Sequence, residues 1–126
     1  MSLAGLERHL SPTPENIGAM AADAIESGSN SNGSWVKWSD GRLYQYGYAV
    51  PVTSDTGDIT FEYPIPFVDT APRPLISAMY STVKDAVITY YAPTLTSFKV
   101  KCSRNDGTII NNLEQGISWL AIGRWQ

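Results

Sequence analysis

Apolar and polar residues alternate over most of the chain. The segment DITFEY (58–63) places Ile59, Phe61 and Tyr63 on one face of an extended chain and polar residues on the other. The segment SFKVKCS (97–103) alternates in the same way, with two lysines opposite its apolar residues. Because successive side chains of a strand point to opposite faces, both segments are predicted to be strands with one buried face. The same reasoning predicts strands for three further ranges, 74–80, 86–91 and 116–125.

An aromatic-rich segment, SWVKWSDGRLYQYGYAV, is predicted to form a β-hairpin. The Asp-Gly step at 40–41 suits a two-residue type I′ turn. Such a turn would place Trp38 opposite Leu43 and Trp35 opposite Tyr46. The hairpin is therefore expected to bring aromatic side chains together across two neighbouring strands.

Three tyrosines, Tyr44, Tyr46 and Tyr48, share one face of the second predicted hairpin strand. Such a face can pack in the core or contact another chain. It can also stand exposed as a stacking ladder for a sugar or a single-stranded nucleic acid. The alternation alone leaves these alternatives open.

Proline and turn residues separate the predicted strands. The range 63–74 holds four prolines in twelve residues, which a central strand does not tolerate. It is predicted to be an extended crossing between sheets or an edge segment. About seven short strands at this spacing predict an all-β fold, an antiparallel β-sandwich.

The N-terminal part of the chain has a different pattern. Residues 1–13 are interpreted as a connector, and TPENIGAMAADAIE (13–26) is predicted to be a short helix, because Thr13 can cap it and Pro14 suits its first position. SGSNSNGS (27–34) is interpreted as a flexible linker. We therefore expect a connector, helix and linker over 1–34 and a β-sandwich over 35–126.

Size, charge and hydropathy narrow the classes of partner. The chain has 126 residues and a formal net charge of −3, with nine Lys and Arg. A nucleic-acid partner would require a basic excess, so none is expected. No apolar run approaches the roughly 18 residues that span a bilayer, and the first residues lack the order of a signal peptide. We expect no membrane insertion.

The residues that usually carry catalysis or bind metals are scarce. One cysteine, Cys102, and one histidine, His9, are present, so neither a disulfide within the chain nor a Ser-His-Asp set is expected. Asp58 and Glu62 share a strand face, but their backbones would lie about 13 Å apart, whereas glycosidase carboxyls lie roughly 5–10 Å apart. We expect no enzyme, no cofactor and no metal site.

Aromatic residues are abundant instead: four Trp, seven Tyr and three Phe. Aromatic residues at strand positions usually pack in the core, because each buries a large apolar area. Those expected in the packing are Trp35 or Trp38, Phe61, Phe98, Trp119 and Trp125.

Several segments resemble the C-terminal, receptor-binding tip domains of bacteriophage tail fibres. The hairpin NGSWVKWSDGRLYQYG, the ending ISWLAIGRWQ, the shaft-like SPTPENIGAM and the Pro-rich YPIPFVDTAPRPLISAMY carry the resemblance, which covers nearly the whole chain. The resemblance implies a β-sandwich similar to the H-type lectins, a homotrimer, and the end of a fibre shaft over residues 1–34. It also implies that the domain lies on the virion tail fibre and adheres to a host surface glycan or an outer-membrane protein. The family has no fixed set of binding residues to carry over.

The expected function is thus multivalent attachment without chemistry. Three predicted loops, 53–58, 82–85 and 103–107, have the side chains to bind hydroxyl-rich ligands. The candidate binding residues are Arg104, Asn105, Asp106, Lys84, Asp85, Asp55 and Asp58. The alternatives are a stand-alone lectin, a structural module that trimerises the fibre without touching a receptor, and a depolymerase.

Overall fold

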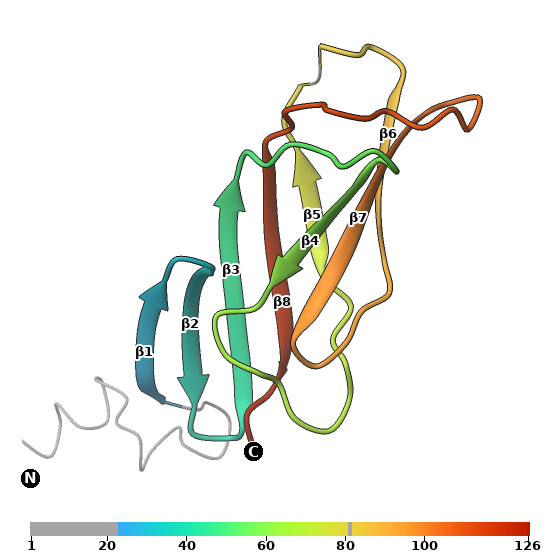
Figure 1. Cartoon of the computed structure of the whole chain (residues 1–126). Coiled ribbons are helices and arrows are strands. Elements are labelled where there is room, and N and C mark those ends of the chain that lie inside the picture. Colours follow the sequence, from blue (N-terminus) through green and yellow to red (C-terminus); the bar gives the residue numbers. More distant parts are fainter. Residues whose placement is uncertain (1–22, 81) are drawn as a thin grey trace, which may run out of the picture.

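The computed structural model describes residues 23–80 and 82–126, and these form strands connected by loops (Figure 1). No helix long and apolar enough to span a membrane occurs among them. The strands of this part of the chain are β1 (Ala24–Asn30), β2 (Gly33–Trp38), β3 (Arg42–Ala49), β4 (Asp58–Glu62), β5 (Leu75–Ala78), β6 (Ala86–Tyr91), β7 (Ser97–Arg104) and β8 (Ile117–Arg124).

The strands form two antiparallel sheets that face each other, so the predicted β-sandwich is confirmed. The larger sheet has five strands in the order β1-β2-β3-β8-β5, and the smaller has three in the order β4-β7-β6. The predicted strand 86–91 coincides with β6, and the other four predicted ranges outside the hairpin overlap β4, β5, β7 and β8. Alternation located β4, β7 and β8 because each has one face buried between the sheets, whereas β5 and β6 are at most half-buried on that side.

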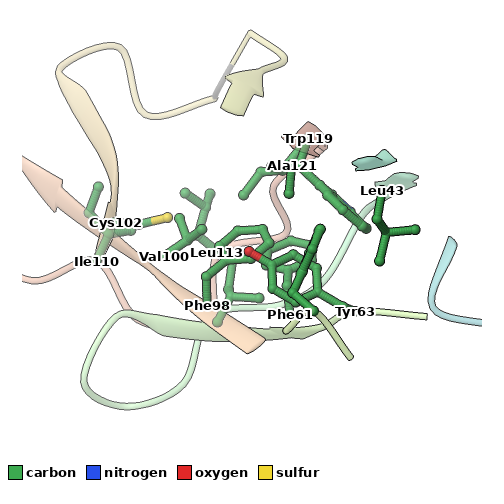
Figure 2. Close-up of a cluster of buried hydrophobic side chains, with 13 residues drawn as sticks. Leu43, Phe61, Tyr63, Phe98, Val100, Cys102, Ile110, Leu113, Trp119 and Ala121 are labelled. Carbon is green, nitrogen blue, oxygen red and sulfur yellow. The ribbon is translucent and has the colours of Figure 1, made fainter. Parts of the chain in front are cut away.

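The core lies between the sheets and is rich in aromatic rings (Figure 2). Phe61 of β4 and Phe98 of β7 stack with ring centroids 5.1 Å apart. Tyr63 meets the ring of Phe67 edge-on and also contacts Trp119 of β8. Cores of this kind gain stability from both the buried area and the ring geometry. The buried apolar residues are Leu43, Ile59, Phe61, Tyr63, Phe67, Phe98, Val100, Cys102, Ile110, Leu113, Ile117, Trp119 and Ala121.

The predicted packing residues divide into two groups. Phe61, Phe98 and Trp119 are buried as expected, while Trp35 and Trp125 are partly buried against the core. The Cys102 thiol is buried, and this burial raises its pKa. Burial disfavours the charged thiolate, so the cysteine serves the packing.

The Pro-rich range 63–74 crosses from the smaller sheet to the larger, as predicted. It leaves β4 and reaches β5 with a single bridge on the way, between Val68 and Arg124. Gln45, which is fully buried on β3, holds it in place: its amide nitrogen donates to the Ile65 carbonyl at 2.7 Å and its oxygen accepts from the Ile65 N–H at 3.0 Å. The crossing thereby satisfies its backbone groups without a strand partner.

The register predicted for the β2–β3 hairpin is wrong by one residue. Trp35 lies opposite Gln45 and Lys37 lies opposite Leu43. The Gly41 N–H donates to the Trp38 carbonyl, and Gly41 has a φ of 95°. This is a longer loop that ends in a left-handed glycine, not a two-residue turn. A one-residue shift moves side chains to the opposite face.

The linker predicted for residues 27–34 is also wrong where strands occupy it. β1 pairs with β2 through Ser27, Gly28 and Ser29. The small residues suit this edge strand, because a Cβ on Gly28 would lie 2.3 Å from the ring of Trp35, which covers it. Ser and Asn side chains do not prevent pairing, since the ladder uses backbone groups.

The predicted helix over 13–26 lies mostly outside the described residues, as does His9, and its last residues from Ala24 onward belong to β1. The division of the chain into 1–34 and 35–126 stays a prediction.

Candidate functional site

The two ends of the sandwich differ in the segments that lie there (Figure 1). Asp23, the first described residue, accepts a hydrogen bond from the Ser39 N–H in the β2–β3 turn. The Trp125 N–H donates to Gly41 of the same turn. The incoming chain and the end of β8 therefore share one end, which we call the chain-entry end. The opposite end, here the loop end, carries three long loops, 50–57, 79–85 and 105–116.

Buried polar residues bind the loops of the loop end to one another. The Thr53 hydroxyl donates to the Ile110 carbonyl at 3.0 Å and accepts from the Leu113 N–H at 2.8 Å. The Gln115 side chain donates to the Met79 carbonyl at 2.8 Å. All three loops are thus connected through two buried side chains. Sequence reasoning missed both, because an isolated Thr or Gln gives no periodic signal.

Two of the predicted binding loops meet through an ion pair. Arg104 at the end of β7 contacts the carboxylate of Asp85 at 2.8 Å. Both side chains are partly exposed, so the pair contributes little to stability by itself. Its consequence is geometric, because it places the 82–85 loop beside the 103–107 loop.

Asp58 is committed to a local network at the start of β4. Its carboxylate pairs with Lys101 at 2.8 Å and accepts from the hydroxyls of Tyr91, at 2.5 Å, and Thr56. Hydrogen bonding from Lys101, Thr56 and Tyr91 holds the pKa of Asp58 far below its ordinary value, and the bond to Asp58 raises the pKa of Tyr91. A carboxylate with these partners is a structural group of the smaller sheet.

Asp106 shapes its own turn. Its carboxylate accepts from the Thr108 N–H at 2.9 Å, and this bond lowers the pKa of Asp106. Gly107 follows with a φ of 90°, and no atom lies within 4 Å of the position that a Cβ would take there. The tip of this loop is therefore open on the solvent side.

The remaining candidates, Asp55, Lys84 and Asn105, are exposed, and their side chains make no hydrogen bond or ion pair within the part of the chain that the structure describes. One belongs to each of the three loops. Lys84 also lines a hollow of about 300 Å³ together with Met79 and Tyr80. Among the seven predicted residues, these three are available to an outside partner, and the other four hold the loops.

The outward face of the five-stranded sheet is apolar. Leu75 of β5 pairs with Leu120 of β8, which pairs with Tyr46 of β3, so three large side chains form a row across the sheet. Ile122 and Tyr44 form a parallel row. Tyr46 is 46% exposed, Ile122 48% and Leu75 67%. We call this surface the apolar outer face.

The tyrosines of β3 face outward because of a glycine on the other side. Gly47 points inward, where a Cβ would lie 2.8 Å from Nε1 of Trp119. The indole needs this space, so β3 turns Leu43, Gln45 and Gly47 to the core and its tyrosines to the outside. The core interpretation of the tyrosine face is thereby wrong, and contact with another chain or with a ligand stays open.

The outward face of the three-stranded sheet is mostly polar, with Val87 of β6 as an exposed apolar residue. Lys99 and Lys101 alternate with the buried residues of β7, and Thr60 and Glu62 do the same on β4. This surface, the polar outer face, interacts well with water. Between the apolar and the polar outer faces the chain offers two different surfaces on opposite sides of one core.

The comparison with known proteins agrees with the β-sandwich described above. The family model described as "tail fiber protein gp53-like, C-terminal" matches residues 37–124. Among curated proteins, none matches the sequence.

Solved tail fibres share the fold. An N-truncated R2-type pyocin tail fiber superposes with a TM-score of 0.58 at 20% identity, over 90% of this chain and 44% of that one. An R2 pyocin fiber of P. aeruginosa gives 0.57 at 19% identity, over 98% of this chain and 30% of that one. An N-truncated R1-type pyocin tail fiber gives 0.57 at 19% identity, over 98% and 97% of the two chains.

The chain thus spans less than half the length of the two R2 fibre chains. At this identity the likeness shows a shared fold, and the family model, which matches most of the chain, shows the membership. The chain belongs to the family of gp53-like tail fibre C-terminal domains and is located on the tail fibre of a phage or phage-like particle.

Proposed function

We propose that this domain attaches the tail fibre to the surface of a host bacterium, as a homotrimer that binds a surface glycan or an outer-membrane protein without chemistry. The observation that carries the proposal is the opposition of the two ends. The chain enters beside the β2–β3 turn, and the three long loops gather at the other end (Figure 1). A fibre that continues from the chain-entry end would present the loop end to the host.

The side chains of the loop end suit a polar surface ligand. Asp55, Lys84 and Asn105 offer an acceptor, a donor and an amide, one from each loop. The hydrogen bonds of Thr53 and Gln115 hold the loops against one another. A preorganised set of polar groups loses less entropy on binding than a mobile one.

The apolar outer face supports assembly into a trimer. Monomeric soluble proteins seldom expose a large contiguous apolar surface, and here Leu75, Tyr46 and Ile122 stand exposed on one sheet. Contact between copies would remove them from water. Three linked sites then raise the avidity by a factor on the order of 10² or more over one site, with no new contact.

A structural module that trimerises the fibre is the second candidate, since the same apolar outer face favours it. The two functions differ in the loop end, which the structural module does not use. A stand-alone lectin is disfavoured by membership in a tail-fibre family.

The test measures binding of the fluorescently labelled protein to a panel of bacterial strains. The double variant Lys84→Ala/Asn105→Ala is compared with Lys99→Ala/Thr89→Ala, which removes exposed side chains from the polar outer face instead. We expect the loop variant to lose about tenfold or more in cell binding while the matched variant binds like the unaltered protein. Equal binding by both variants, with the trimer intact by light scattering, would favour the structural module.

A further inference from the structure

A second hollow lies on the flank of the sandwich, where it reaches the end of β3 and Pro51 at the start of the 50–57 loop. It has a volume of about 340 Å³ and opens between the β1–β2 turn, residues 30–33, and the edge strand β4. Sequence reasoning did not find this hollow, because the turn lies in the segment interpreted as a linker. No function described above uses this hollow.

The floor of the flank hollow is apolar. It is lined by Ile59 and Phe61 of β4 and by Trp119 of β8. The indole of Trp119 lies close to two glycines: a Cβ on Gly33 would come within 3.1 Å of its Cζ2, and one on Gly47 within 2.8 Å of its Nε1. The glycines thus let the indole pack closely against the backbone, and the side chain, which is 4% exposed, presents only an edge to the hollow.

The Trp119 indole also offers a hydrogen-bond donor. The side chain is 4% exposed, and its N–H has no acceptor among the residues that the structure describes. The N–H groups of Trp35 and Trp125, in contrast, donate to Glu26 and to the Trp38 carbonyl. The Trp119 N–H is not among the buried unpaired polar atoms, so it can reach water in the hollow, and a ligand that takes the place of this water can supply the acceptor.

The rim of the flank hollow has polar side chains that are available for hydrogen bonds. Asn32 of the turn and Thr60 and Glu62 of β4 line it. Their side chains have no hydrogen-bond or ion-pair partner within residues 23–80 and 82–126. The rim therefore provides an amide, a hydroxyl and a carboxylate above an aromatic floor. This combination suits a sugar ring, which has apolar faces and hydroxyls around its edge.

One end of the hollow is closed. Asn30 donates to the Pro64 carbonyl at 3.0 Å, which ties the turn to the chain just after β4. An extended peptide could not continue along the edge of β4 past this bond. A volume of about 340 Å³ lies near the lower limit of the roughly 300–1,000 Å³ of small-molecule sites. The hollow is therefore suited to a compact ligand.

Charge selects among compact ligands. Glu62 is the one charged residue that lines the hollow, and no Lys, Arg or His does so. A carboxylate that lacks a cationic neighbour repels phosphates, uronates and other anionic sugars. We propose that the flank hollow binds a neutral pyranose, with Glu62 and Asn32 bonding its hydroxyls and an edge of the Trp119 indole at its base. The inference rests on the proposed attachment to a host glycan and adds a site distinct from the exposed residues Asp55, Lys84 and Asn105.

The test titrates the trimeric protein with the methyl glycosides of glucose, galactose, mannose and N-acetylglucosamine, and with methyl glucuronide as the anionic comparison. The readouts are the Trp119 indole N–H signal in a ¹H–¹⁵N spectrum and isothermal titration. We expect at least one neutral glycoside to bind and to shift that signal, and the glucuronide to bind at least about tenfold more weakly.

Variants separate the flank hollow from the loop end. Glu62→Gln and Asn32→Ala should each weaken glycoside binding by about tenfold, the loss expected for a strong hydrogen bond. Glu114→Gln and Asn111→Ala, the same changes at exposed positions of the loop end, should leave it unchanged. Thermal unfolding checks that every variant is folded.

Three results would overturn the inference: no binding of any neutral glycoside, binding that survives both hollow variants, or equal binding of the glucuronide. If the protein binds cells but binds none of the glycosides, the flank site is overturned and the proposed attachment is unaffected. Glycoside binding in the flank hollow, without attachment to any strain, would sustain the site and count against the proposed attachment.

Discussion

The apolar and polar outer faces cover the same core, yet their large exposed side chains differ in chemistry. The five-stranded sheet presents Leu75, Tyr46 and Ile122, whereas the three-stranded sheet presents Lys99 and Glu62. The strands of both sheets alternate equally well, so alternation by itself does not show which outer face meets water. The residue type at the outward positions therefore distinguishes the two faces: polar side chains indicate contact with water, and apolar side chains indicate a partner.

The largest effect should come from the core that the two faces share. Phe98 is fully buried and stacks on Phe61. We expect Phe98→Ala to lower the free energy of unfolding by about 3–5 kcal/mol, through lost burial and the cavity left behind. Chemical denaturation at fixed protein concentration measures this loss. A change below about 1 kcal/mol would show that the two sheets do not depend on this contact.

The next effect concerns assembly and separates the two faces directly. Ile122→Asp places a charge on the apolar outer face, and Thr89→Asp places the same charge on the outward side of β6. We expect the first variant to reduce the association constant by more than about tenfold, because a desolvated carboxylate costs at least about 1.4 kcal/mol. Light scattering over a dilution series measures the oligomer.

The second variant, Thr89→Asp, should assemble like the unaltered protein. Equal dissociation of both variants, or of neither, would contradict the assignment of the apolar outer face to contact between copies.

A smaller effect concerns the polar outer face and depends on pH. Because hydrogen bonds from Lys101, Thr56 and Tyr91 lower the pKa of Asp58 in the folded state, the unfolded chain takes up the proton first as the pH falls. The stability from Asp58 is therefore complete above its unfolded pKa of about 3.9 and is lost below it.

We expect Asp58→Asn to melt at a lower temperature than the unaltered protein at pH 7, with the difference shrinking toward pH 3. Subtracting the two melting curves removes the contributions of the other carboxylates. A difference that stays constant between pH 7 and pH 3 would show that the network does not depend on the charge of Asp58.

The smallest effect lies at Tyr63, where the hydroxyl is buried without a hydrogen-bond partner among the described residues. Tyr63→Phe removes this polar atom and keeps the ring contacts with Phe67 and Trp119. We expect a change between zero and about 1 kcal/mol in favour of the folded state, measured by denaturation. A clear loss of stability would reveal a partner for the hydroxyl.

Sequence reasoning predicted the strands well and their pairing less well. The buried residues of β4 and β7 alternate without interruption, so the sequence predicted correctly which of their residues face the core. The β2–β3 hairpin was misread by one position, because Asp40-Gly41 is compatible with more than one turn and the choice depends on pairing across the sheet. β1 was missed, because Ser and Gly on an edge strand carry no apolar signal.

The sequence predicted which loops form the candidate site, but not what each side chain does in it. Turn residues located the loops, and the structure places the 82–85 and 103–107 loops side by side through Asp85 and Arg104. Which side chains hold the loops and which remain available depends on partners far away in the sequence, such as Lys101 for Asp58. Contacts between residues that are far apart in the sequence cannot be read from a single sequence. The flank hollow was missed for the same reason.

The open tip at Gly107 has a consequence for how such a domain can change. No atom lies within 4 Å of the position that a Cβ would take there, but the φ of 90° strains any residue other than glycine, so this tip changes more readily by lengthening the loop, which costs little in closure entropy. New residues can therefore accumulate between Asn105 and Thr108 without disturbing the sheets beneath. The scaffold therefore tolerates insertions at this tip, although the backbone at Gly107 itself favours glycine.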